Sequence, residues 1–200
     1  MKGSLIIISF FIAGVILARM DLLHDFFYAT DYTVYVLYLL MFFVGISVGS
    51  DSGIFSSVKR YGYKIFLLPL GTILGTLIGC TVVGLVWHGR SLADCLAVGS
   101  GFGYYSLSTI FITQLRGAEL GTVALLSNIL RELTALLFAP LLVMVFGRLA
   151  PISVGGATTM DTTLPIITRY SGKDFVAIAI FHGFVVDFSV PFLVTFFASL

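Results

Sequence analysis

Charged side chains are scarce in this sequence. Asp, Glu, Lys and Arg together make up 10% of the 200 residues, against roughly 25% in ordinary soluble domains. Hydrophobic residues make up 58%, and the mean hydropathy is +1.08. A water-soluble fold cannot hide that much apolar surface. The composition therefore excludes a soluble globular protein and indicates one embedded in a lipid bilayer.

The patterns of several other classes of protein are also absent. The net charge is +1 and no basic run is longer than Lys59-Arg60, which excludes an electrostatic surface for nucleic acid. The two cysteines, Cys80 and Cys95, lack metal-ligand spacing, so we expect no metal or other cofactor and two buried, unpaired thiols. The metal, nucleophile-elbow and phosphate-loop motifs of enzymes are missing, so we expect no catalytic activity.

Long apolar stretches are what the sequence does contain. Backbone groups in lipid must bond within their own segment, and the alternating polarity of barrel strands is absent. We therefore predict an all-α polytopic membrane protein whose residues 1–200 form a single transmembrane domain. The predicted spans are 5–18, 33–48 and 65–87 within the first part, 1–90, and two long helices at 117–148 and 174–200.

Two further apolar segments, 91–116 and 151–168, are interrupted by Gly, Ser and Thr. Non-helical backbone at membrane depth is tolerated only where protein buries it or water lines it, so we interpret both as broken helices. If they are re-entrant segments that enter from opposite sides, the chain crosses the membrane five times. If they are discontinuous full crossings, it crosses seven times, and the loop charges do not distinguish these topologies.

The loop charges do indicate an orientation. Residues 20–31 contain three Asp and no Lys or Arg, whereas residues 51–64 contain Lys59, Arg60 and Lys64. Cytoplasmic loops carry an excess of Lys and Arg, so the second loop is predicted to be cytoplasmic. This places the N-terminus inside, and both topologies place the C-terminus outside.

Acidic residues within the apolar segments are the main candidates for function. A charge at the centre of a membrane helix costs at least about 2.5 kcal/mol, so it rarely persists without a task or a partner. Glu132 lies near the middle of a long span, on the same face as Asn128, and both are expected to bind substrate. Asp161 lies between glycines and Pro165, where a helix break is expected. Because the ends of broken helices bind ions in many secondary transporters, we expect a transporter of small solutes.

Other polar residues near these acids are candidates as well. Arg131 is expected to be a buried ion-pair partner of Asp161 or Asp187, with Asp187 preferred. His182 is interpreted either as a proton carrier or as a hydrogen-bonded packing residue. Amide and hydroxyl donors for an anionic group are expected from the two Gly-rich segments. The residues in question are Ser100, Gly101, Gly103, Ser106, Ser108, Thr158 and Thr159.

The residues in four stretches together resemble the LysO-type lysine exporter family. These stretches are 97–108, 128–133, 156–165 and 180–184. The resemblance implies export of L-lysine, and of analogues such as thialysine, across the bacterial cytoplasmic (inner) membrane. It also implies that two intramembrane acids, Glu132 and Asp161, serve in transport. Full-length members look longer, so this chain would match their C-terminal two thirds, and a small membrane subunit or a homodimer is an expected partner.

The charges of lysine suggest a mechanism. Carboxylates at Glu132 and Asp161 would bind its amines, and the Gly-rich segments would donate to its carboxylate. Exporting a cation against an inside-negative potential costs about 2.3 kcal/mol per 100 mV, so we expect antiport with protons carried by Glu132, Asp161 and His182. The alternatives are a broken-helix transporter for another small solute or ion, or a membrane subunit that needs a partner for activity.

Overall fold

The computed structural model describes residues 62–86 and 89–200, together with isolated residues between 13 and 59. The spans expected at 5–18 and 33–48, and most of the loops around them, lie outside the described residues. The chain divides into two compact units, Met1–Ser47 and Val48–Leu200, and the second unit is described here by itself. Its described residues form helices and turns without a strand, which confirms the all-helical prediction for this part.

Three segments of the described chain are long and apolar enough to cross a membrane. They have 25, 29 and 27 residues, and about 20 residues suffice for the hydrocarbon core of a bilayer. The segments are Gly62–Val86, made of η1 (Gly62–Phe66) and α5 (Leu67–Val86); α8 (Ala118–Phe146); and Lys173–Ser199, made of η3 (Lys173–Phe175) and α11 (Val176–Ser199).

The first Gly-rich segment consists of two short helices, α6 (Leu92–Gly99) and α7 (Tyr105–Arg116). Ser91 begins α6 through a capping box with Asp94, which satisfies backbone donors that a helix start leaves free. The helix then breaks at residues 100–104, where Gly103 has a φ of 95° and Phe102 a φ of 45°. Such left-handed backbone ends a right-handed helix.

The second Gly-rich segment is broken in a similar way. It comprises α9 (Ala150–Gly155), η2 (Gly156–Met160) and α10 (Leu164–Tyr170). Gly156 has a φ of 63°, and a proline stands in the first turn of both α9 and α10, where its missing N–H leaves no helical bond unmade. Asp161 lies in the turn that precedes α10.

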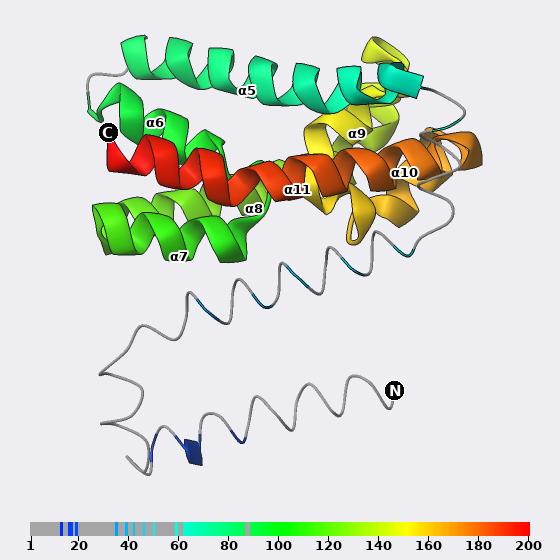
Figure 1. The fold of residues 1–200 in the computed structure, drawn as a ribbon. Coiled ribbons are helices and arrows are strands. Elements are labelled where there is room, and N and C mark those ends of the chain that lie inside the picture. Colours follow the sequence, from blue (N-terminus) through cyan, green and yellow to red (C-terminus); the bar gives the residue numbers. More distant parts are fainter. Residues whose placement is uncertain are drawn as a thin grey trace. The chain divides into compact units, whose positions relative to one another are not determined.

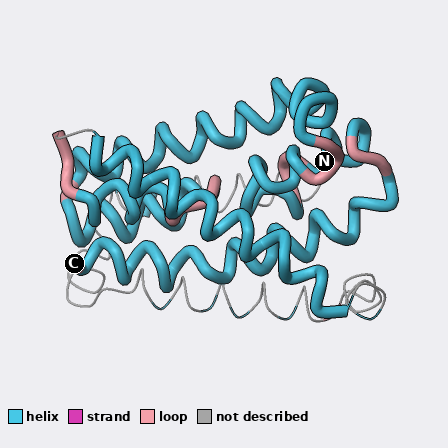
Figure 2. Tube along the Cα trace, turned by 90° about the horizontal axis from the view of Figure 1, so that it is seen from above, coloured by secondary structure: helices cyan, strands magenta, loops and turns pink. Residues whose placement is uncertain are grey.

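Each broken segment begins and ends at the same end of the bundle. Asp94 at the start of α6 lies 3.6 Å from Arg116 at the end of α7, and Arg116 Nε donates to the carbonyl of Ala198 near the end of α11, at 2.7 Å. Ile152 of α9 and Ile167 of α10 instead pack together at the opposite end of α11. Figures 1 and 2 show α6 and α7 gathered near the C-terminus and α9 and α10 at the other end of the spanning helices.

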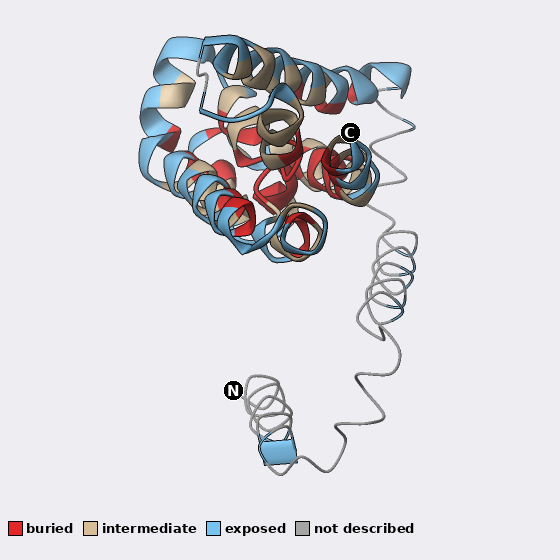
Figure 3. Cartoon of the chain, turned by 90° about the vertical axis from the view of Figure 1, so that its left-hand side faces the viewer, coloured by how far each residue is buried: buried red, intermediate tan, exposed pale blue. Residues whose placement is uncertain are grey.

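The two breaks meet in the interior of the unit. The amide of Ala157 donates to the carbonyl of Phe102 at 3.0 Å. The break of the first segment, residues 100–104, thus bonds to that of the second, residues 156–160, and we call these two breaks the first and second tips. α11 passes beside both, and Gly183 leaves room for this contact, since a Cβ there would lie 2.8 Å from the amide nitrogen of Met160. Buried residues gather around the junction, while the outward faces of α5 and α8 carry exposed apolar side chains suited to lipid (Figure 3).

Candidate functional site

Arg131 of α8 holds the junction of the two tips. Its Nε donates to the carbonyl of Val154 at 2.9 Å and its Nη2 to that of Ser153 at 3.1 Å, both at the end of α9. Its Nη1 donates to Thr76 Oγ1 at 3.2 Å, and the guanidinium lies 5.8 Å from the ring centroid of Phe102. A single side chain thus joins α5, α8 and both broken segments.

The expected ion pair between Arg131 and Asp187 is not formed in this arrangement. Within the part of the chain that the structure describes, the ion pairs are Arg90–Glu119 and Asp94–Arg116. Arg131 instead has backbone carbonyls and a threonine hydroxyl as its acceptors. The exposed carbonyls at the C-terminal end of α9 carry partial negative charge, so they supply the attraction that a carboxylate was expected to give.

Asn128 supports the tip of the first segment. Its Oδ1 accepts from the amide of Gly103 at 2.7 Å, and its Nδ2 donates to the carbonyl of Ala124 at 2.8 Å and to Ser108 Oγ at 3.4 Å. Gly101 allows this approach, because a Cβ there would overlap the Asn128 amide group. Asn128 was expected to bind substrate, but in this structure its polar atoms are occupied by protein.

The hydroxyls expected to bind an anionic group bond mostly to backbone. Ser100 Oγ donates to the carbonyl of Leu96 at 2.7 Å and Ser108 Oγ to that of Tyr104 at 2.8 Å. Thr158 Oγ1 donates to the carbonyl of Gly155 at 2.9 Å, and Thr159 Oγ1 lies 2.8 Å from the carbonyls of Gly156 and Ala179. Gly101 and Gly103 are buried in the tip, whereas Ser106 is exposed. Apart from Ser106, these residues stabilise the two tips.

His182 lies fully buried within a row of hydroxyl groups. Its Nε2 is 2.9 Å from Thr72 Oγ1 and its Nδ1 is 3.3 Å from Thr159 Oγ1. Thr72 Oγ1 is in turn 2.7 Å from Ser153 Oγ. Both ring nitrogens therefore have hydroxyl partners, and the row joins α5 and α11 to the second broken segment.

Two aspartates and a tyrosine come together beside the tips. Asp187 of α11 is 3% exposed. It lies one turn beyond Gly183, which packs against the amide of Met160, the residue before Asp161, so the two carboxylates lie within electrostatic range of each other. Tyr104, at the end of the first break, is within electrostatic range of both. Sequence reasoning selected Asp161 but assigned Asp187 to Arg131, and it missed Tyr104, for which the Gly-Tyr-Tyr sequence after the break was the available signal.

Glu132 stands apart from these contacts. It lies half-buried on α8, one turn beyond Asn128, and it makes no hydrogen bond or ion pair with the described residues. Asp161 is exposed, and its carboxylate accepts from the amide of Thr162. The structure therefore places Asp161 within electrostatic range of Asp187 and Tyr104, and it shows no contact between Glu132 and Asp161.

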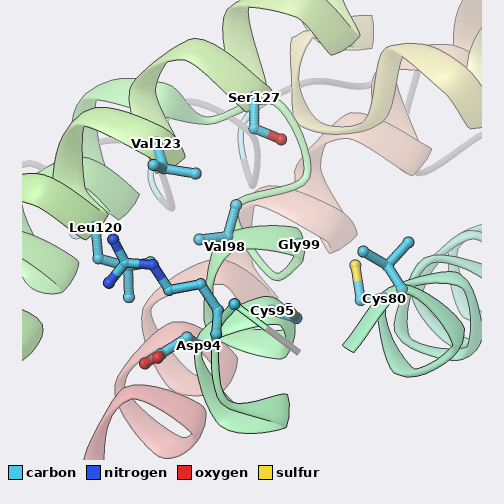
Figure 4. Close-up of a pocket in the computed structure, with 11 residues that line it drawn as sticks. Cys80, Asp94, Cys95, Val98, Gly99, Leu120, Val123 and Ser127 are labelled. Atoms are coloured by element: carbon cyan, nitrogen blue, oxygen red, sulfur yellow. The ribbon is translucent and has the colours of Figure 1, made fainter. Parts of the chain in front are cut away.

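A cavity of about 450 Å³ lies between α5, α6 and α8 (Figure 4). Val83, Val98, Leu120 and Val123 give it apolar walls, and Arg90 and Asp94 lie at the end of the unit where α6 begins. Cys80, Cys95 and Ser127 also line it. Both thiols are free and half-buried, so they contribute to the wall of this cavity and do not form a bond.

Comparisons with known proteins identify the family. The family model described as lysine exporter LysO matches residues 8–198. The lysine exporter LysO of Escherichia coli (strain K12) is 34% identical over 175 residues, which are 86% of this chain and 56% of that protein. A protein of Haemophilus influenzae (strain ATCC 51907 / DSM 11121 / KW20 / Rd) named "Putative lysine exporter" is 35% identical over 197 residues, 96% of this chain and 97% of that one. No solved structure matches. The chain belongs to the lysine exporter LysO family.

Proposed function

We propose that this protein exports L-lysine across the bacterial cytoplasmic membrane in exchange for protons. The observation that carries the proposal is that Gly183 of α11 packs against Met160, the residue before Asp161, while Asp187 lies one turn further along α11. Neither carboxylate has a cationic partner among the described residues. Two negative charges at membrane depth repel each other and require a compensating cation or proton.

Lysine provides the compensating charge. Its side-chain ammonium is a compact cation with three donors, which suits two carboxylates that approach from different elements. Protons neutralise the same carboxylates once lysine has left. Because lysine and protons compete for one acidic pair, each can drive the other across the membrane, which is the requirement for antiport.

Glu132 is assigned to the second ammonium. Lysine carries an α-amine as well as a side-chain amine, and Glu132 is a half-buried carboxylate without a partner among the described residues. Its place on α8, near Asn128 and the first tip, makes it a candidate for the α-amine. The same site accepts thialysine, because replacing one methylene by sulfur leaves both amines and the carboxylate in place.

His182 enters the proposal as a link between helices. Its ring nitrogens contact Thr72 and Thr159, and no carboxylate is among its hydrogen-bond partners. A proton carrier needs a route to the group that it serves, and the hydroxyl row that contains His182 includes Ser153, Thr72 and Thr159 but no carboxylate. The proton-carrying role is therefore assigned to the acids.

The proposed topology has five membrane-spanning helices and two re-entrant segments. It is supported by the contacts that bring the start of α6 to the end of α7 and pack α9 against α10. With the N-terminus inside, α6 and α7 enter from the outside, α9 and α10 enter from the cytoplasm, and the C-terminus lies outside. The 450 Å³ cavity then opens on the outer side and serves as the exit route.

Counterflow in vesicles tests the substrate. The purified chain is reconstituted into vesicles loaded with unlabelled L-lysine, and the uptake of labelled L-lysine is followed. Transient accumulation above equilibrium supports the proposal. Accumulation of only another amino acid, carboxylate or Na⁺ in parallel assays identifies a transporter for a different solute.

A membrane subunit that requires a partner is the second candidate function. It is favoured by one observation, namely that the match covers 56% of the E. coli protein. If the purified chain shows no counterflow of any solute, while vesicles that contain a co-purified membrane partner do, this second candidate is correct. Counterflow by the chain alone, whether as a monomer or a homodimer, excludes it.

A further inference from the structure

Arg131 lines an open groove on the side of the second unit. The groove has a volume of about 290 Å³ and lies between α5, α8 and α9. Besides Arg131 it is lined by Gly71, Thr72, Gly75, Thr76, Ser153 and Val154. Its walls thus combine a guanidinium with three hydroxyl groups, and a guanidinium binds anions well.

The guanidinium retains donors for a ligand. An arginine has five N–H donors, and three of those on Arg131 bond to Val154, Ser153 and Thr76. One N–H on each terminal nitrogen is left without an acceptor among the described residues. A carboxylate accepts two such donors and provides the negative charge that a cation at membrane depth requires.

The glycines keep the groove open. A Cβ built on Gly71 or on Gly75 meets no atom within 4 Å, so the space beside Arg131 is bounded by backbone on this side. The groove also lies at a depth suited to a substrate site. Arg131 is near the middle of α8, and Thr76 is near the middle of the Gly62–Val86 span. Substrate sites of secondary transporters lie at this depth.

We propose that this groove, which we call the Arg131 groove, binds the α-carboxylate of the exported amino acid. The inference rests on the proposed function and assigns to Arg131 and Thr76 the anion-binding role that the Gly-rich segments were expected to play. The buried hydroxyls of those segments bond to backbone, whereas the Arg131 groove retains free guanidinium donors. Lysine is then recognised at both ends, by acids at its amines and by a cation at its carboxylate.

A pair of ligands and a pair of variants test this inference. L-Lysine is compared with pentane-1,5-diamine, which has both amines and no carboxylate, by measuring Kd for the full-length protein in bilayer discs. Gly75→Leu fills the groove without changing Arg131, and Gly79→Leu is the matched control, because it lies on the same helix, also has free space at its Cβ, and lines neither the groove nor the cavity.

The wild type and Gly79→Leu are expected to bind lysine at least about tenfold more tightly than the diamine, as charge-assisted hydrogen bonds allow. Gly75→Leu is expected to lose that preference while its affinity for the diamine stays the same. If Gly75→Leu keeps the preference for lysine, or if it lowers the affinity for both ligands equally, the groove does not bind the carboxylate. If the wild type binds neither ligand, the proposed function fails, and this inference fails with it.

The phosphate of an anionic lipid is the other source of a suitable negative charge. The measurement is therefore made in discs of phosphatidylcholine alone and in discs that also contain phosphatidylglycerol. If the preference for lysine over the diamine is the same in both kinds of disc, the ligand of the groove is the substrate carboxylate. If the preference is present in phosphatidylcholine, whose headgroup has no net charge, and disappears in the anionic discs, the groove binds an anionic lipid headgroup and the inference is wrong.

Discussion

Single residues at the junction are under tight steric control. Gly156 has a φ of 63°, and a Cβ on it would overlap the carbonyl oxygen of Phe102, the atom that accepts the bond from Ala157. Backbone in the left-handed region is accessible to glycine and costs other residues about 1–2 kcal/mol. The contact between the two tips therefore depends on the absence of a side chain at this position.

Gly156→Ala is predicted to destabilise the protein more than the same change at Gly147. Both glycines have a positive φ, of 63° and 87°, but Gly147 has no atom within 4 Å of its built Cβ. The control thus carries the backbone strain, about 1–2 kcal/mol, and Gly156→Ala carries the overlap as well. Thermal unfolding in detergent measures the difference, and equal losses for the two variants would show that the tips do not meet at Phe102.

Asn128→Ala is predicted to lower stability by about 1–3 kcal/mol, since the buried amide of Gly103 loses its acceptor. Thr122→Ala is the control on the same helix, because the Thr122 hydroxyl is exposed and bonds only to a carbonyl of its own helix. Thermal unfolding of the two variants provides the comparison. A loss of lysine affinity in Asn128→Ala at unchanged stability would assign Asn128 to the substrate instead.

The contrast between expected and observed partners has a simple physical cause. The sequence shows which residues are polar within an apolar segment, and the cost of burying charge directs attention to Glu132 and Asp161. It does not show which acceptors surround a side chain. Arg131 was expected to meet a carboxylate, but the carbonyls at the end of α9 lie within its reach. Asp187 therefore has no ion pair with Arg131, and it interacts electrostatically with Asp161.

At the scale of elements, the breaks in the two Gly-rich segments were predictable and their paths were not. Glycine with a positive φ and proline in a first turn explain where α6, α7, α9 and α10 begin and end. Whether a broken segment returns or crosses depends on contacts far apart in the sequence, such as that between Asp94 and Arg116. Loop charges could not show whether the segments return or cross, because the two topologies place equal numbers of Lys and Arg on the cytoplasmic side.

Labelling of single cysteines is predicted to show re-entrant segments. In a background with Cys80 and Cys95 replaced by serine, a cysteine is placed at Ala118 or at Arg148, both of which are exposed positions at opposite ends of α8. A membrane-impermeant maleimide added to intact cells should react with the first and not with the second. The reverse result would indicate seven crossings.

At the scale of the whole molecule, the spanning helices and the two broken segments converge on one interior region. α11 passes beside both tips and carries His182, Gly183 and Asp187 within little more than one turn. Arg131 reaches the same region from α8. The all-helical class follows from composition alone, whereas this convergence depends on tertiary contacts that no periodicity in the sequence indicates.

Lysine and protons are proposed to compensate the charge of the same pair of aspartates, Asp161 and Asp187. This proposal is tested by loading vesicles with labelled L-lysine, imposing an acidic exterior on the face from which protons enter, and measuring efflux. The compared proteins are the wild type, Asp161→Asn, Asp187→Asn and the control Asp174→Asn, an exposed position at the start of the last span.

Proton-driven efflux is predicted to fall at least about tenfold in Asp161→Asn and in Asp187→Asn, because each variant removes one of the two carboxylates proposed to bind lysine and protons, and the loss of a charged hydrogen-bond partner exceeds the free energy of a tenfold change. It is predicted to remain at the wild-type rate in Asp174→Asn. Wild-type rates in both Asp161→Asn and Asp187→Asn would contradict the account.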